Sequence, residues 1–257
     1  MMHSQPHHQA ILAIIPARGG SKGIPRKNVM MLAGKPLIAH SILQAKASAR
    51  INRIIVSTDD DEIASVAREW GAETPFMRPA EYAQDLSPDI DVFHHALTWL
   101  KDHEGYEPCL VVHLRPTGPV RRIELVDGAI DLLASHEEAD AVRSVTLAAQ
   151  SPYKMWRIEA NGYLEPLLRL PNLPDCQSMP RQSLPITYWQ NGYVDVIRPR
   201  AILEKGSMWG DRALPFVMDE SLFELDYPEN IPAVEAALQN CDQDAPRPAV
   251  TLMRHPV

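Results

Sequence analysis

Apolar residues in the first 150 positions fall into short runs that alternate with stretches of helical period. The run ILAII at residues 11–15 is apolar without interruption. A run of this length is typical of a strand that is buried on both faces of a parallel sheet. Residues 110–114 predict a second buried strand, and residues 54–57 and 141–145 complete the strands expected here.

Four helices are predicted between these strands, over residues 37–49, 61–70, 88–100 and 122–134. The pattern is clearest in the second helix, because its apolar side chains share one face and Gly71 follows its last turn. That face is formed by Ile63, Val66, Ala67 and Trp70. Strands that alternate with helices predict an α/β fold with a doubly wound, mostly parallel sheet, which binds ligands at the carboxyl ends of its strands.

The composition changes at about residue 151, where prolines become frequent and the helical period disappears. We interpret residues 151–185 as an arm inserted into an α/β domain made of residues 10–150 and 186–240. Residues 194–197 predict a further strand and residues 231–239 a helix, whereas residues 241–257 predict a loose C-terminal tail.

The predicted arm carries more apolar side chains than so small a segment easily buries. Either a partner covers these side chains, or the arm forms a small core of its own. The residues concerned are Trp156, Leu164, Leu167, Leu168 and Leu170.

Charge and cysteine content narrow the possible functions. The chain has 257 residues, with 25 Lys and Arg against 33 Asp and Glu, so its net charge is −8. This balance argues against a general nucleic-acid binder or a membrane-surface protein. Three widely spaced cysteines form neither a disulfide framework nor a zinc pattern, and no segment resembles a secretory signal or a membrane span. We expect a soluble, cytoplasmic protein.

A glycine-rich loop follows the first predicted strand and carries four cations, Arg18, Lys22, Arg26 and Lys27. Three glycines within five positions let the backbone approach a bulky ligand closely. Cations on such a loop, in an acidic protein, predict a polyphosphate ligand. The loop matches neither G-x-x-x-x-G-K-[ST] nor G-x-G-x-x-G, and Pro25 delays any following helix.

Residues 16–28 (PARGGSKGIPRKN) and 34–38 (GKPLI) closely resemble the signature of acylneuraminate cytidylyltransferases, the synthetases of CMP-sialic acids and related CMP-nonulosonates. Five further segments follow in the order of that family and at about its spacing. They are residues 54–60 (IIVSTDD), 78–81 (RPAE), 114–121 (LRPTGPVR), 181–185 (RQSLP) and 191–192 (NG). The resemblance covers about residues 10–240 and implies a fold of the nucleotide-diphospho-sugar transferase type, with an arm that pairs with a second subunit.

The resemblance implies roles for the loop residues. Arg18 and Lys22 would contact the phosphates of CTP, and Lys27 would lie near the α-phosphate, where charge builds in the transition state. Asn28 would hydrogen-bond the nucleotide, and Arg78 would lie on the nucleotide side. The remaining nucleotide-binding residues are Ala17, Gly19, Gly20 and Ser21, whereas Arg26 is expected to face solvent.

Two late carboxylates are the candidates for holding Mg²⁺. Residues 222–228 (LFELDYP) resemble the D-x-D segment of the family, with Glu224 in place of the first Asp and Asp226 as the second. Alternation along an extended strand would put both carboxylates on one face, where hard oxygens suit Mg²⁺. The longer Glu224 side chain still supplies an oxygen ligand. In contrast, the acidic run at residues 59–62 is interpreted as the start of a helix rather than a metal site.

The residues predicted to bind the sugar are Arg115, Arg181, Gln182 and Asn191. Much of the family has Gln where this chain has Arg115, and Ser where it has Gly118. The fork of Arg115 could bind a sugar carboxylate or phosphate, or it could form a salt bridge. Arg181 matches the family in spacing and suits the carboxylate of a nonulosonate. The histidines, including His94, His95 and His113, form no catalytic arrangement.

Together these features predict an enzyme that transfers CMP from CTP to a nonulosonic acid and releases pyrophosphate. Arg18, Lys27 and Asp226 are its expected catalytic residues, and the proton acceptor is either Asp226 or a water on the metal. We expect a homodimer or a dimer of dimers. Two alternatives stay open: a nucleotidyltransferase for another sugar, such as an octulosonate, or for another NTP, and a non-catalytic nucleotide-binding module.

Overall fold

A six-stranded sheet forms the centre of the computed structural model, which describes residues 10–219 and 223–241. The strand order is β10-β6-β9-β5-β1-β4, and every strand except β9 runs in the same direction. The strands are β1 (Ile11–Pro16), β4 (Arg53–Ser57), β5 (Leu110–His113), β6 (Ala141–Leu147), β9 (Tyr188–Ile197) and β10 (Ala213–Val217). The prediction of an α/β fold with a mostly parallel sheet is therefore confirmed.

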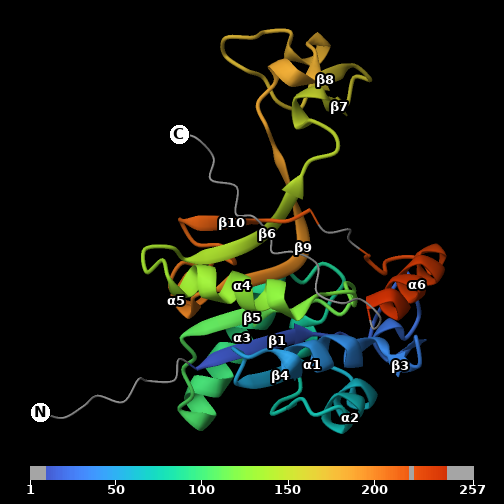
Figure 1. The fold of residues 1–257 in the computed structure, drawn as a ribbon, viewed down its shortest axis with the longest axis vertical. Helices are drawn as coiled ribbons and strands as arrows, with labels where there is room; N and C mark the ends of the chain where they lie inside the picture. The colour runs from blue at the N-terminus through green and yellow to red at the C-terminus, as the bar shows by residue number, and fades with distance from the viewer. Residues whose placement is uncertain (1–9, 220–222, 242–257) are drawn as a thin grey trace, which may run out of the picture.

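Helices cover both faces of this sheet (Figure 1). One face packs against α1 (Leu37–Ala47), α2 (Asp61–Glu69) and α4 (Ile123–Ala134), and the other against α3 (Asp89–Glu104) and α5 (Pro199–Leu203). Strand β1 supplies both cores. Ile11, Ala13 and Ile15 belong to the first core and Leu12 and Ile14 to the second, as the two-residue period of a strand requires.

A third, smaller core joins residues 24–37, which follow β1, to residues 225–238 near the carboxyl end of the described chain. The hairpin of β2 (Met31–Leu32) and β3 (Lys35–Pro36) packs against α6 (Ile231–Cys241), and the two lie side by side in Figure 1. Leu225 is fully buried in this core, beside Ile24 and Leu32. Packing of Leu225 therefore holds the segment around it against the loop that follows β1.

Strands β6 and β9 continue beyond the sheet and carry a lobe that stands away from the rest of the molecule (Figure 1). The lobe contains the hairpin of β7 (Trp156–Ile158) and β8 (Leu164–Pro166). Four of the five apolar side chains singled out above are exposed in the lobe: Trp156, Leu164, Leu167 and Leu168. Among the described residues they belong to none of the three cores.

The described residues also contain short 3-10 helices. They are η1 (Lys27–Val29), η2 (Ala80–Tyr82), η3 (Pro152–Lys154), η4 (Cys176–Ser178), η5 (Arg181–Ser183) and η6 (Pro228–Asn230). None of the helices within residues 10–219 and 223–241 is both long and apolar enough to cross a membrane.

Most predicted elements are present, with some differences. All four early helices form, and α3 extends to Glu104, where Gly105 ends it in a left-handed conformation with φ of 62°. Strand β9 begins at Tyr188, six residues before the predicted start, since it also pairs with the extension of β6. Strand β10 and helix α5 were not predicted. Most of the predicted tail, residues 242–257, lies outside the described residues.

The expectation of an extended strand at the two late carboxylates was wrong for the described part of that segment. Residues 223–228 form no strand and pair with no sheet. The side chains nevertheless alternate, because Leu225 is buried while Glu224 and Asp226 are exposed. Burial of Leu225 in the third core, rather than sheet pairing, produces this alternation.

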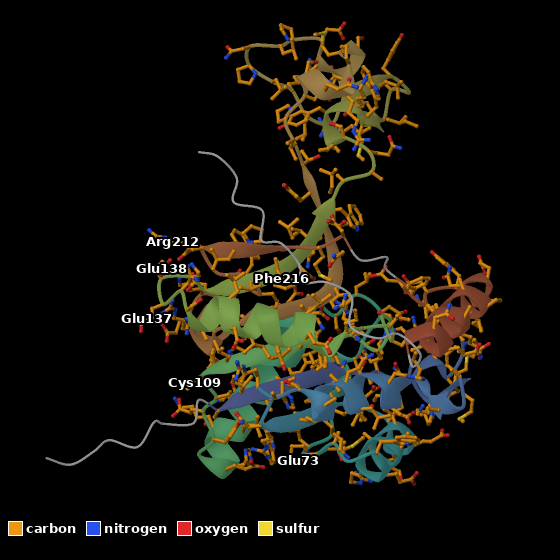
Figure 2. All side chains as sticks on the ribbon, in the orientation of Figure 1. Glu73, Cys109, Glu137, Glu138, Arg212 and Phe216 are labelled. Atoms are coloured by element: carbon orange, nitrogen blue, oxygen red, sulfur yellow. The ribbon has the colours of Figure 1, made fainter. Side chains whose placement is uncertain are left out.

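Asp140 lies at the amino ends of β6 and β10, near Glu137, Glu138 and Arg212, which Figure 2 labels. Its buried carboxylate pairs with Lys205 Nζ at 2.7 Å and Arg200 Nε at 3.0 Å, and accepts a hydrogen bond from the amide of Asp211 at 2.9 Å. Burial alone would raise the pKa of Asp140, but Lys205, the Asp211 amide and Arg200 outweigh burial and lower it.

We predict that Asp140→Asn lowers the free energy of unfolding by about 2 kcal/mol at pH 7, because charge-assisted hydrogen bonds are lost. A carboxyl whose pKa is lowered by folding stabilises the protein above its unfolded pKa of about 4, and this contribution disappears as the pH falls further. Urea unfolding should therefore show a gap between wild type and variant at pH 7 that narrows below pH of about 4. Glu138→Gln, at an exposed site nearby, is the control; a gap of equal size at both pH values would contradict the prediction.

Candidate active site

A cavity of about 620 Å³ opens at the carboxyl ends of β1 and β5. Four segments far apart in the sequence line it: the loop after β1, residues 78–92, residues 115–117 and residues 226–227. Its polar and charged lining residues are Arg18, Ser21, Lys22, Lys27, Asn28, Arg78, Tyr82, Gln84, Asp85, Ser87, Asp89, Arg115, Thr117, Asp226 and Tyr227. Of the predicted residues outside the glycine-rich loop, Arg78, Arg115 and Asp226 reach this cavity.

Hydrogen bonds hold the loop after β1 in a fixed shape. The amide of Gly19 donates to Asp59 Oδ1 at 2.9 Å, and buried Asn28 donates from Nδ2 to the carbonyl of Arg18 at 2.9 Å. Arg26 adopts a left-handed conformation with φ of 56°, immediately before η1. The loop is thus held open around the cavity instead of continuing into a helix.

Arg26 and the acidic run at residues 59–62 stabilise this loop. Asp60 caps α2 by accepting a hydrogen bond from the amide of Ile63 at 3.0 Å, which confirms that the run starts a helix. Arg26 is exposed, as expected, but it also pairs with Asp60 and Glu62. The hydrogen bond from Arg26 is the main reason that the pKa of Asp60 is lowered.

Lys27 connects the loop to the far end of the chain. Its Nζ donates to the carbonyl of Leu225 at 2.9 Å and lies 3.5 Å from Asp226 Oδ1. Gly23 lies so close to this segment that a Cβ there would overlap the carbonyl oxygen of Asp226. Only glycine allows this approach. The cationic loop and one of the two late carboxylates are therefore in contact.

Asp85 lies opposite the other two cations of the loop. Lys22 Nζ is 2.5 Å from Asp85 Oδ2, and Arg18 Nη1 is 3.2 Å from Asp85 Oδ1. The hydrogen bond from Lys22 is the main cause of a lowered pKa at Asp85. Arg18 also donates to the carbonyl of Gln84 at 2.6 Å. The segment that carries Asp85 is thus held against the loop by charge.

Arg78 is the most deeply buried cation of the cavity. It donates to the hydroxyl of Ser57 at 3.1 Å and to the Ser57 carbonyl, and it has no ion pair among the described residues. Desolvation lowers the pKa of Arg78 to about 10. The side chain is still charged at neutral pH, so an anion in the cavity would meet a cation that forms no salt bridge with a described carboxylate.

Arg115 forms salt bridges, one of the two possibilities that the sequence left open. Its Nη1 is 3.2 Å from Asp195 Oδ2 and its Nη2 is 3.3 Å from Asp89 Oδ2. The neighbouring Arg121 is buried and donates to the carbonyls of Tyr193 and Arg115 at 2.7 and 2.6 Å. A Cβ at Gly118 would lie 3.3 Å from Arg121 Nη2, so the small residue here leaves room for that buried guanidinium.

Glu224 lies near Arg115 but is not among the residues that line the cavity. A Cβ at Gly192 would lie 3.3 Å from Glu224 Oε1 and 3.6 Å from Arg115 Nη1, so all three groups meet at this glycine. Desolvation and the nearby charge of Asp226 raise the pKa of Glu224. A cation between the two carboxylates would relieve their mutual repulsion.

The donor chemistry of Glu224 and Asp226 fits a hard divalent cation. Within residues 10–219 and 223–241, no group of three or more His, Cys, Asp or Glu side chains is arranged to hold a metal. Mg²⁺ commonly takes one or two carboxylates and completes its shell with phosphate oxygens and water. Two carboxylates at or beside a cavity that is also lined by cations match that pattern.

The other predicted sugar-side residues do not reach the cavity within this chain. Arg181 and Gln182 are exposed on η5, outside the sheet, and Arg181 donates to the carbonyl of Ala148 at 2.8 Å. Asn191 is buried on β9, where its Oδ1 accepts a hydrogen bond from the amide of Tyr193. His113 is buried on β5, as predicted, and burial lowers its pKa well below the usual value.

Sequence reasoning missed the acidic residues that face the cations, Asp85, Asp89 and Asp195. Asp85 and Asp89 lie just beyond residues 78–81, the motif that was recognised, but the intervening loop has no periodic pattern. Asp195 lies inside an otherwise apolar strand. A carboxylate at such a position needs a partner, and this was the one sequence feature that could have pointed to Asp195.

Known proteins resemble this chain in sequence. Residues 12–154 match the family model described as cytidylyltransferase. The chain is 33% identical to the CMP-N,N'-diacetyllegionaminic acid synthase of Legionella pneumophila over 240 residues, which cover 91% of this chain and 98% of that protein. It is 32% identical to the N-acylneuraminate cytidylyltransferase of Escherichia coli, over 84% of this chain and 49% of the relative.

Solved structures share the fold at low sequence identity. A CMP:2-keto-3-deoxy-manno-octonic acid synthetase complexed with CTP matches with a TM-score of 0.65 and 16% identity, covering 90% of this chain and 99% of that one. The 4-diphosphocytidyl-2C-methyl-D-erythritol synthase of Anaerococcus prevotii matches with a TM-score of 0.60, also at 16% identity, over 90% and 99% of the two chains.

We predict that Asp85→Asn strengthens the binding of inorganic tripolyphosphate about two- to fivefold, because the anion no longer competes with a carboxylate for Arg18 and Lys22. Titration calorimetry measures this affinity directly. Glu81→Gln removes a charge from the same segment, outside the cavity, and should leave the affinity unchanged. Weaker binding by Asp85→Asn would instead show that Asp85 is needed to shape the site.

Proposed function

The chain belongs to the cytidylyltransferase family, and on that basis we propose that it transfers CMP from CTP to a nonulosonic acid, releasing pyrophosphate. One structural observation carries this proposal: Lys27 and Asp226, 199 residues apart, meet in a cavity that Arg18 and Lys22 also line. The 33% identity to a CMP-N,N'-diacetyllegionaminic acid synthase over 98% of that protein supports the substrate class.

The cations of the loop after β1 bind the triphosphate. Arg18 and Lys22 exchange Asp85 for the β- and γ-phosphates. Lys27 is held in place by its hydrogen bond to the Leu225 carbonyl, and there it faces the α-phosphate. Lys27 is mostly shielded from solvent, so its charge acts strongly on the transition state. Arg78, Asn28 and Ser21 line the part of the cavity that we assign to the nucleotide.

Asp226 and Glu224 hold a divalent cation, which we propose to be Mg²⁺. When bound, the metal offsets the negative charge of the phosphates that the reaction redistributes. The contribution of the chain is to present the two carboxylates on either side of buried Leu225 and next to Lys27.

The reaction exchanges one bond at the α-phosphorus for another. The anomeric oxygen of the sugar acid forms a bond to this phosphorus while the bond to pyrophosphate breaks, and the hydroxyl proton is lost to a base. The carboxylate of Asp226, which faces the cavity, can accept that proton. Positioning and charge compensation supply the rate enhancement, since the protein forms no covalent bond to the substrate.

We also propose that the arm at residues 151–185 pairs with a second copy of the chain. Its exposed Trp156, Leu164, Leu167 and Leu168 form an apolar surface that a partner would cover. Pairing would also account for Arg181 and Gln182, which lie outside the cavity of their own chain.

We propose that the protein is located in the cytoplasm. Cys109 and Cys176 are free thiols, which suits the reducing conditions there.

The activity is tested by mixing the protein with CTP, Mg²⁺ and a panel of neuraminic, legionaminic and pseudaminic acids, and measuring pyrophosphate release. We expect turnover of at least one acid. Lys27→Ala should lower kcat about 100-fold or more, because a positioned cation at the developing charge is lost. Lys35→Ala, which removes a cation outside the cavity, is the control.

Absence of pyrophosphate with every acid of the panel would contradict this function. Thermal shifts with the four NTPs and a parallel assay with an octulosonate would then identify another base or sugar, because a bound ligand raises the melting temperature. Binding of CTP without turnover of any sugar would indicate a non-catalytic nucleotide-binding module.

The arm is tested by light scattering during gel filtration. We expect the wild type to be a dimer or a dimer of dimers and Trp156→Glu combined with Leu164→Glu to be a monomer, since two buried charges would oppose docking. Trp209→Glu alters a tryptophan of similar exposure outside the arm and should leave the assembly intact. A monomeric wild type would refute the proposed pairing.

A further inference from the structure

Two carboxylates of very different burial hold the guanidinium of Arg115. Asp195, which binds Nη1 at 3.2 Å, is completely buried, whereas the side chain of Asp89, which binds Nη2 at 3.3 Å, is 44% exposed. Asp89 and Arg115 both line the cavity. The two sides of the fork therefore face different surroundings, protein interior on one side and cavity on the other.

The buried partner depends on Arg115. Asp195 lies on β9 between His113 of β5 and Arg143 of β6, its register partners in the sheet. Both ring nitrogens of His113 and Oδ1 of Asp195 lack a hydrogen-bond partner in the described structure, and Arg143 Nε is 3.9 Å from Asp195. The bond from Arg115 is the single hydrogen bond that Asp195 accepts from a described residue. A buried carboxylate needs such a partner, so this bond is expected to persist.

The exposed partner does not depend on Arg115. Asp89 is the first residue of α3, where the positive end of the helix dipole stabilises a carboxylate on its own. The pair of Asp89 and Arg115 is only partly buried and open to the cavity, so breaking it costs less free energy than breaking the pair with fully buried Asp195.

Arg115 also lies beside the proposed reaction centre. Gly192 has φ of 67° and separates Arg115 from Glu224 without a side chain of its own. Asp89, Arg115 and Asp226 all line the cavity, so a ligand group that took the place of Asp89 at Nη2 would lie in the same cavity as Asp226. A sugar acid must place its anomeric hydroxyl in this region, and its carboxylate is attached to the same carbon.

We propose that the carboxylate of the sugar acid replaces Asp89 at Nη2 of Arg115, while Asp195 stays in place as the positioning residue for this arginine. The inference rests on the proposed function and adds to it a residue that determines specificity. Arg115 then recognises the acid through an exchange of carboxylates, so the net charge of the cavity wall changes little when the substrate binds.

Variants at the exposed partner give the sharpest test. Asp89→Asn should lower the KM for the sugar acid about two- to fivefold and leave the KM for CTP unchanged, because the substrate no longer displaces a charged competitor. Asp91→Asn removes a charge from the same first turn of α3, outside the cavity lining, and serves as the matched control.

Variants at the arginine and its buried partner should act in the opposite direction. Arg115→Gln should raise the KM for the sugar acid about tenfold or more and reduce the preference for the acid over its carboxamide, because the recognising charge is lost. Asp195→Asn should raise the same KM with less effect on that preference. Arg115→Lys keeps the charge and should restore part of the preference, and melting temperatures show whether each variant folds.

The outcomes separate this inference from the proposed function. If the wild type forms a CMP-sugar but Asp89→Asn and Arg115→Gln leave the KM for the acid within twofold, the inference fails and the function stands. Equal changes in the KM for CTP and for the acid would also overturn the inference. If the wild type neither binds nor converts any acid of the panel, in calorimetry and in the pyrophosphate assay, both are overturned.

Discussion

The contact between the loop after β1 and residues 225–226 is the constraint on which the cavity depends. Lys27 donates to the Leu225 carbonyl, Leu225 is buried against the loop residue Ile24, and Gly23 lies against the Asp226 carbonyl. This contact is made of a hydrogen bond, an apolar core and a close backbone approach at once. Removing any one of them would displace a carboxylate from the cations.

Charge compensation organises the rest of the cavity. Arg18 and Lys22 share Asp85, Lys27 faces Asp226, and Arg115 is held between Asp89 and Asp195. Cations gathered in a partly desolvated space repel one another, and each pairing offsets part of that cost. An anionic substrate can exchange with an exposed carboxylate such as Asp85 or Asp89, but not with a buried one such as Asp195.

The antiparallel strand β9 links the cavity to the arm. It brings Asp195 next to His113 and Arg143 inside the sheet, and its extension pairs with β6 beyond the sheet edge. A single strand therefore supplies the anchor for Arg115 and part of the support for the exposed apolar lobe. β9 pairs with both β5 and β6 at residues 195–197 but with β6 alone at residues 188–190, so a two-stranded extension of the sheet carries the lobe.

The sequence by itself determined the local features of this protein, because these depend on patterns within a few residues. Apolar runs and helical periods identified the strands and helices of the first 150 residues, and glycines with cations identified the loop after β1. The burial of Leu225 between two acidic residues also follows a local pattern, although the predicted strand there does not form.

Only the tertiary structure decided which charges meet. Asp85, Asp89 and Asp195 are separated from the cations they pair with by 26 to 80 residues in the sequence, and no local pattern encodes such a pairing. The pairings of Arg115 depend on the position of β9 between β5 and β6 and on the start of α3 beside the cavity. Strand order and packing are properties of the whole chain, since they are set by burial of all its apolar faces together.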